Sequence, residues 1–161
     1  MKVKRLLLAA LAATSMVAVT ACDGDVVQIG ILKFINIAPL NSAEEGFIKA
    51  LDDAGINYKL TLKDANADGS LVASSSLTLV GESDLVLGIA TPAASGLLSA
   101  RAIKGNDVPI FFTAVTDPVF SGLMSDDEAP DNNVPGTSDM HPVREQVELF
   151  TQLGLGIDKI G

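Results

Sequence analysis

A chain of 161 residues with 20 acidic and 11 basic side chains has a formal charge of −9, which excludes the basic surface that nucleic-acid binding requires. The single cysteine excludes a disulfide within the monomer and any cluster of cysteine metal ligands. About 140 residues remain beyond the N-terminal leader, which is enough for one domain with its own core.

The N-terminus has the pattern of a bacterial lipoprotein signal peptide. Basic residues at positions 2–5 precede an apolar run, Leu6 to Val19, that is too short and too soon followed by charge for a transmembrane helix. Small residues then precede Cys22. We expect residues 1–21 to be removed, which lowers the formal charge from −9 to −12, and Cys22 to carry a diacylglycerol on a tether at 22–25. The alternative is a buried cysteine in a secreted protein without an anchor.

From Val26 onward, apolar runs typical of strands alternate with stretches in which apolar residues recur at helical spacing. Gly55 and Gly81 follow the first two helical stretches and are expected to end them. The run Leu85 to Ala90 is almost wholly apolar, which is typical of a parallel strand buried on both faces. The pattern predicts a three-layer α/β fold around a parallel sheet, with strands at 26–32, 58–62, 85–90, 109–115 and 134–138 and helices at 40–54, 70–80, 91–103 and 142–153.

Two stretches fall outside this alternation. Residues 126–133 are acidic and predict a surface loop. At 158–161 a further apolar strand begins and breaks off, which we interpret as a truncated sequence.

In such sheets, ligands bind beyond the carboxyl ends of the strands. The third strand is followed by Thr91-Pro92-Ala93-Ala94. Threonine is a good helix N-cap, and proline is favoured in the first helical turn. Because Ala93 and Ala94 have small side chains, their backbone N–H groups are expected to be open to an anion such as a ligand carboxylate. The alternative is an ordinary helix start.

Thr116 and Asp117 follow the next strand. At that edge the Asp117 carboxylate would accept hydrogen bonds from a ligand ammonium, a strong kind of polar contact. The alternative is that Asp117 caps the short segment 118–123. An anion site and a carboxylate on neighbouring strand ends match the two charges of an amino acid.

Three further residues are candidates with a structural alternative each. Asp139 lines the cleft or, as the favoured interpretation, caps the last helix. Phe34 stacks on a ligand side chain or belongs to the core. Asn66 lies in a segment that we interpret as a turn first and as a ligand loop second.

The sequence offers little for catalysis. His141, the only histidine, is near Ser138 and Asp139 in sequence, but a catalytic triad must converge in space. We find no nucleophile elbow, phosphate loop or dinucleotide motif, and we predict no metal and no cofactor. A hydrolase-type enzyme remains the last alternative.

Several segments resemble a known family. Residues 89–94, 109–119 and 136–140, together with Asn66-Ala67 and Gly46-Phe47, resemble the ABC-transporter solute-binding lipoproteins of the tryptophan/tyrosine-binding type. The resemblance runs from about residue 26 to 161. It implies a type I periplasmic-binding-protein fold, in which two lobes close on the ligand. Residues 26–157 would form the first lobe and 158–161 the start of a second.

The resemblance also implies roles for the candidate residues. Thr91 to Ala94 would take the ligand carboxylate, Asp117 the amino group, and Asp139 would lie near the hinge. After the first strand, where the family usually has a glutamine and a His-Pro pair, this chain has Lys33, Ile37 and Ala38. The pocket for the ligand side chain therefore stays open in this prediction, and a lysine there would favour an acidic group.

Together these features predict an extracytoplasmic, lipid-anchored protein that hands a small amino-acid-like ligand to an ABC permease and its ATPase. A sensor module whose ligand-bound form is read by a membrane histidine kinase is the main alternative. The genes adjacent to the coding sequence would distinguish the two.

Overall fold

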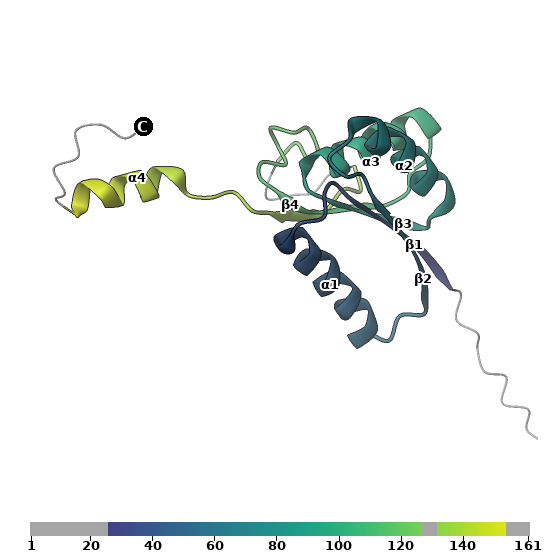
Figure 1. Ribbon diagram of the computed structural model, residues 1–161. Helices are drawn as coiled ribbons and strands as arrows, with labels where there is room; N and C mark the ends of the chain where they lie inside the picture. The colour runs from purple at the N-terminus through teal and green to yellow at the C-terminus, as the bar shows by residue number, and fades with distance from the viewer. Residues whose placement is uncertain (1–25, 127–131, 154–161) are drawn as a thin grey trace, which may run out of the picture.

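A five-stranded sheet forms the centre of the computed structural model, which describes residues 26–126 and 132–153 (Figure 1). Every neighbouring pair of strands is parallel, and the strand order is β2-β1-β3-β4-β5. The predicted α/β class is confirmed. The strands are β1 (Val27–Lys33), β2 (Tyr58–Asp64), β3 (Leu85–Ile89), β4 (Ile110–Val115) and β5 (Gly136–Ser138).

Helices cover the two faces of the sheet unequally. α1 (Ala38–Asp53) lies on one face, whereas α2 (Gly69–Glu82) and α3 (Thr91–Lys104) lie side by side on the other (Figure 1). This follows from the strand order, because right-handed crossovers that run in opposite directions along a parallel sheet place their helices on opposite faces. β2 lies on one side of β1, while β3 and β4 follow on the other side.

Each face has its own apolar core. On the α1 face, Ile29 and Ile31 of β1 pack with Leu40 and Leu51 of α1. Leu32 points to the opposite face and joins the core under α2 and α3, as the alternation of side chains along a strand requires. The core positions on β1 and β3 are almost fully buried, and for β3 this agrees with the predicted burial on both faces.

α3 contacts the sheet very closely. A Cβ atom built on Gly88 of β3 would lie 2.6 Å from Ala94 Cα and 2.7 Å from Ala94 N. The first turn of α3 therefore lies directly on β3, and the glycine is what makes this contact possible.

The sequence predicts that Gly55 and Gly81 end the first two helices, and the structure tests both predictions. Gly55 follows α1 with a φ of +65°, a left-handed conformation that favours glycine, as expected. The prediction for Gly81 is wrong, because this residue lies inside α2. That helix ends one residue later and is followed by Ser83 in extended backbone, which requires no glycine.

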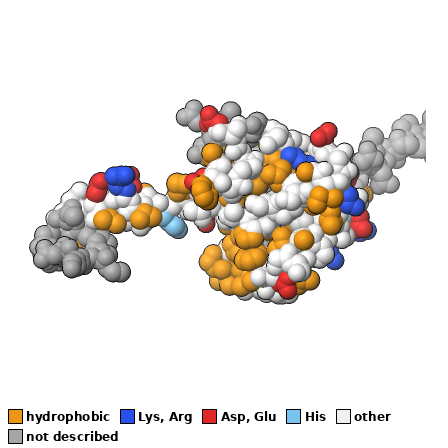
Figure 2. Space-filling view, turned by 90° about the horizontal axis from the view of Figure 1, so that it is seen from above, with side chains coloured by type: hydrophobic (Ala, Val, Ile, Leu, Met, Phe, Trp, Pro, Cys, Tyr) orange, Lys and Arg blue, Asp and Glu red, His pale blue; other side chains and the backbone are white. Residues whose placement is uncertain are grey.

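α4 (Val143–Gln152) follows β5 and lies apart from the sheet and its helices (Figure 1). Figure 2 shows hydrophobic side chains on α4 beside charged ones. Val143 and Leu149 are more than half exposed. In the part of the chain that the structure describes, no helix is long and apolar enough to cross a membrane. The predicted signal peptide, Cys22, most of the acidic loop and the strand expected at 158–161 lie outside the described residues.

Candidate ligand-binding site

The carboxyl ends of the strands form one edge of the sheet. Lys33, the last residue of β1, is in register with Ile89 of β3, and Val115 of β4 is in register with Ser138 of β5. The chain order reverses between β1 and β3, because β2 lies on one side of β1 and β3 on the other. Ligands of open parallel sheets bind at such a reversal point. The site is therefore expected beyond the ends of β1 and β3, with β4 as its neighbour.

At the end of β3, the backbone holds the start of α3 in an unusual conformation. Ala90 has φ 79° and ψ 154° and is the N-cap of α3, so the prediction that Thr91 is the N-cap is wrong. Two backbone hydrogen bonds fix Ala90 in this place. Its N–H donates to Thr113 O over 3.0 Å, and its carbonyl accepts from the Ala94 N–H over 3.1 Å. An alanine has no side chain that could cap the helix, so the amino end of α3 lacks a side-chain cap.

The structure leaves fewer groups available for an anion than the sequence predicts. Ala93 and Ala94 are fully buried, and the Ala94 N–H is already used inside the helix. Thr91 is half-buried, and its hydroxyl makes no hydrogen bond with any described residue. Thr91 is thus the accessible polar residue at the positive end of the α3 dipole.

Asp117 caps a turn, as its structural alternative predicted. Its Oδ1 accepts the Phe120 N–H over 2.8 Å, and its carbonyl accepts the Ser121 N–H over 3.0 Å. The turn is anchored by Pro118 and Leu123, which are buried. The second carboxylate oxygen of Asp117 has no partner among the described residues, so the carboxylate keeps one free acceptor at the edge.

The end of β4 is also irregular. Ala114 has a φ of 54°, and the pairing of β4 with β5 shifts between Phe112 and Val115. Thr116 is exposed, and its carbonyl accepts the Ser138 hydroxyl over 2.9 Å. Strained backbone and register shifts concentrate at functional sites. The sequence contained no signal for them, since alanine does not favour positive φ.

At the end of β1 the structure shows a polar cluster that sequence reasoning missed. The Lys33 ammonium donates to Glu44 Oε2 over 2.7 Å and to Asn41 Oδ1 over 2.8 Å. Asn41 in turn donates to Asn36 Oδ1 over 2.7 Å. The sequence suggests that Lys33 would favour an acidic ligand. Because the Glu44 carboxylate neutralises the Lys33 ammonium, the lysine does not by itself do so.

Phe34 and Asn66 have structural roles. Phe34 is half-buried and packs against the core under α2 and α3. Asn66 has a φ of 49°, and its N–H donates to Asp64 Oδ1 over 2.8 Å, so it lies in the predicted turn. Ala67 follows with a φ of 61° and donates its N–H to Phe34 O, which ties this turn to the loop after β1.

Asp139 is exposed and does not cap the last helix. Its N–H donates to Val115 O over 3.0 Å, while its carboxylate makes no hydrogen bond within the described residues. α4 begins only at Val143, four positions later, which is too far for a cap. His141 is exposed as well. Across the described residues, no group of three or more His, Cys, Asp and Glu side chains could hold a metal ion.

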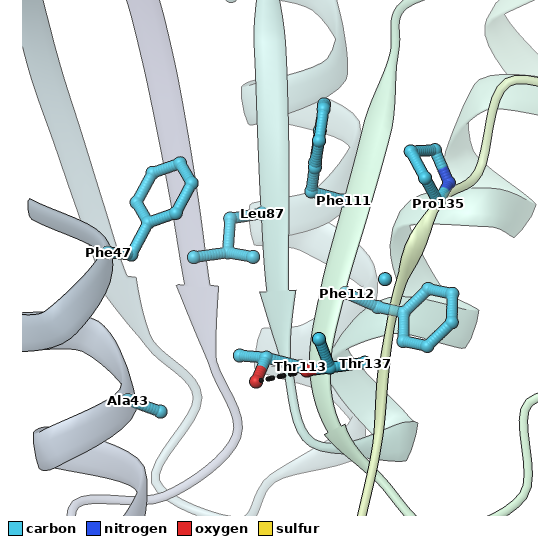
Figure 3. Close-up of a pocket in the computed structure, with 9 residues that line it drawn as sticks. Ala43, Phe47, Leu87, Phe111, Phe112, Thr113, Pro135 and Thr137 are labelled. Atoms are coloured by element: carbon cyan, nitrogen blue, oxygen red, sulfur yellow. Dashed lines mark hydrogen bonds between the residues drawn. The ribbon is translucent and has the colours of Figure 1, made fainter. Parts of the chain in front are cut away.

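A cavity of about 440 Å³ lies on the face that carries α1, over β3, β4 and β5 (Figure 3). Phe47 of α1 and Leu87 and Phe111 of the sheet point toward it. Its lining is mostly apolar, and its hydroxyl groups are paired, since Thr137 Oγ1 donates to Thr113 Oγ1 over 3.0 Å. The cavity contains no charged side chain, so it does not offer the contacts that a charged amino acid needs.

Comparison with known proteins agrees with this architecture. The family model described as ABC transporter substrate binding protein matches residues 28–161. The tyrosine-binding protein of Clostridioides difficile (strain R20291) is 38% identical over 139 residues, which are 83% of this chain and 39% of that protein.

Solved structures extend the comparison. An ABC domain from Streptococcus pneumoniae in complex with L-Trp is 38% identical, with a TM-score of 0.71 over 78% of this chain and 43% of that one. The ligand-free, open structure of a substrate binding protein with adhesive properties from Clostridium difficile is 33% identical, with a TM-score of 0.71 over 79% and 43%. The chain spans less than half the length of these relatives. It belongs to the family of ABC transporter substrate-binding proteins.

Proposed function

We propose that this chain is a ligand-binding lobe of an extracytoplasmic substrate-binding protein that delivers an aromatic amino acid to an ABC permease and its ATPase. Relatives named for tyrosine and solved with L-Trp, both 38% identical, support an aromatic ligand. The family consists of binding proteins, which supports the prediction that the chain is not an enzyme.

One observation supports an amino acid above other ligands. The uncapped amino end of α3, with Thr91 open, lies beyond β3, and the free carboxylate oxygen of Asp117 lies beyond β4. Neighbouring strands are roughly 4.8 Å apart. A ligand carboxylate at Thr91 and a ligand ammonium at Asp117 would therefore be close enough to belong to one amino acid.

A single sheet edge contacts a ligand from one side only. Small-molecule sites bury most of the ligand surface, about 70–90%. The relatives are more than twice as long as the part that this chain matches, which supports a second lobe that encloses the ligand in the full-length protein.

Calorimetry on the full-length protein tests this function. We expect saturable binding of L-tyrosine or L-tryptophan, and much weaker binding of L-leucine as an aliphatic control. The proposal is wrong if none of the aromatic amino acids binds.

We also propose that Cys22 carries the lipid anchor, on the strength of the small residues before it. Cys22→Ser should abolish incorporation of radiolabelled palmitate and release the protein from the membrane fraction. Unchanged incorporation and unchanged membrane partition would contradict the anchor.

A further inference from the structure

The polar cluster at the end of β1 consists of Lys33, Glu44, Asn41 and Asn36. The side chains of Lys33 and Glu44 are only 7% and 16% exposed. An ion pair that is largely removed from water is weak evidence for stability, because desolvation offsets much of the attraction. The cluster therefore calls for a reason beyond holding α1 on the sheet.

The hydrogen-bonding capacity of this pair is not used up. An ammonium has three N–H donors, and Lys33 uses two of them, on Glu44 and Asn41. Glu44 accepts through Oε2, while its Oε1 has no partner in the described parts of the chain. One donor and one acceptor thus remain on adjacent, almost buried groups.

A hydroxyl group matches this remainder, since it accepts one hydrogen bond and donates another. An indole N–H would satisfy Glu44 only. A phenyl ring would satisfy neither group, and a carboxylate would be attracted by Lys33 but repelled by Glu44.

The position of the cluster is suitable for a ligand side chain. Lys33 lies next to Ile89 in the register of β1 and β3, one residue before the backbone turns into α3. β1 and β3 flank the reversal point of the sheet. If β3 and β4 take the two charges of the amino acid, the end of β1, on the other side of β3, is left for its side chain.

We propose that Lys33 and Glu44 form a specificity-determining pair that recognises the hydroxyl group of the ligand side chain, so that the protein prefers tyrosine to tryptophan and tryptophan to phenylalanine. This inference rests on the proposed function. Lys33 donates to the phenolic oxygen, and the phenolic O–H donates to Glu44 Oε1. A site that hydrogen-bonds a hydroxyl rejects the analogue without it, because its own buried groups are then left unpaired.

The test measures the affinity of the full-length protein for tyrosine and for phenylalanine by calorimetry. The wild type should bind tyrosine about tenfold to a hundredfold more tightly, as expected for hydrogen bonds to charged groups. In the double variant Lys33→Met with Glu44→Leu, this ratio should fall to about threefold or less, with the loss in the affinity for tyrosine. Lys33→Leu with Glu44→Met, which also removes both hydrogen-bonding groups, is a second variant for the case that the first does not fold.

The exposed pair Lys49 and Asp53 on the same helix supplies the control, since both of its side chains are mostly in solvent. Lys49→Met should leave the tyrosine-to-phenylalanine ratio unchanged. A ratio that stays at the wild-type value in a folded variant of the Lys33 and Glu44 pair overturns the inference and leaves the proposed function intact. A wild type that binds no aromatic amino acid overturns the proposed function itself.

Discussion

Two junctions between a strand and a helix flank the reversal point of the sheet, and they are built differently. The β3–α3 junction is a single residue, Ala90, held by backbone hydrogen bonds and by the close contact of Gly88 with Ala94. The β1–α1 junction is a four-residue link, held by the side chains of Lys33 and Glu44 with their two asparagines. Neither helix has a side-chain cap at its amino end.

The two junctions differ in how strongly substitutions would change them. A junction fixed by backbone keeps its geometry under most substitutions, which suits recognition of the charges that all amino acids share. A junction fixed by side chains changes its chemistry with each substitution, which suits recognition of the variable part of the ligand. The predictions below test this division.

The largest effect is expected at the side-chain junction. Glu44→Leu leaves the almost buried Lys33 charge without its partner, which should lower the free energy of unfolding by about 3 kcal/mol. Adding Lys33→Met should restore stability to within about 1 kcal/mol of the wild type, because two apolar side chains can replace a buried ion pair. Urea denaturation measures both. Equal destabilisation in the single and double variants would show that the loss does not come from the unpaired Lys33 charge.

Asp117 is next, because its carboxylate combines a structural contact with a proposed ligand contact. Asparagine keeps the acceptor for the Phe120 N–H and removes the charge, so Asp117→Asn should lower ligand affinity by about thirtyfold or more, corresponding to about 2 kcal/mol. The melting temperature should hardly change, since asparagine caps as well as aspartate does. Unchanged affinity in this variant would leave Asp117 as a cap only.

A similar loss, in stability, is expected at the backbone junction. Gly88→Ala places a Cβ atom 2.6 Å from Ala94 Cα, and α3 must move to accommodate it. We expect a loss of about 2 kcal/mol in the free energy of unfolding. Ligand affinity should fall as well, because the amino end of α3 moves with the helix. Wild-type stability in this variant would mean that the contact is not tight in solution.

The smallest effect has the opposite sign. Gly46 lies in the middle of α1, and a Cβ atom there would meet nothing within 4 Å. Gly46→Ala should therefore raise the free energy of unfolding by about 0.5–1 kcal/mol through the higher helix propensity of alanine. A glycine-to-alanine substitution is thus expected to destabilise the contact of β3 with α3 but to stabilise α1, where a Cβ atom has room. A destabilising Gly46→Ala would show that α1 is more closely packed than the structure indicates.

Much of the fold could be predicted from the sequence, because strands buried on both faces leave uninterrupted apolar runs. β3 and α3 were predicted to within one residue at each end. The errors arose where the backbone departs from the preference of its residue. Alanine gives no sign of a positive φ at position 90, so the sequence favours Thr91 as the cap.

The candidate site was less predictable than the fold. Thr91 and Asp117 were found because they follow strands, which is a matter of order along the chain. The pairing of Lys33 with Glu44 depends on how α1 returns over the sheet, eleven positions later. The charge of Lys33 can be read from the sequence, but its neutralisation by Glu44 cannot.

The contact between Gly88 and Ala94 also bears on the kinetics of binding. A helix that rests directly on the sheet cannot turn independently of it, so the groups at its amino end keep their orientation before any ligand arrives. Preorganised contacts reduce the conformational entropy that a ligand must otherwise overcome. The ligand backbone would thus be captured at this rigid end first, and the choice among side chains would be made afterwards, in the rate at which the wrong ligand leaves.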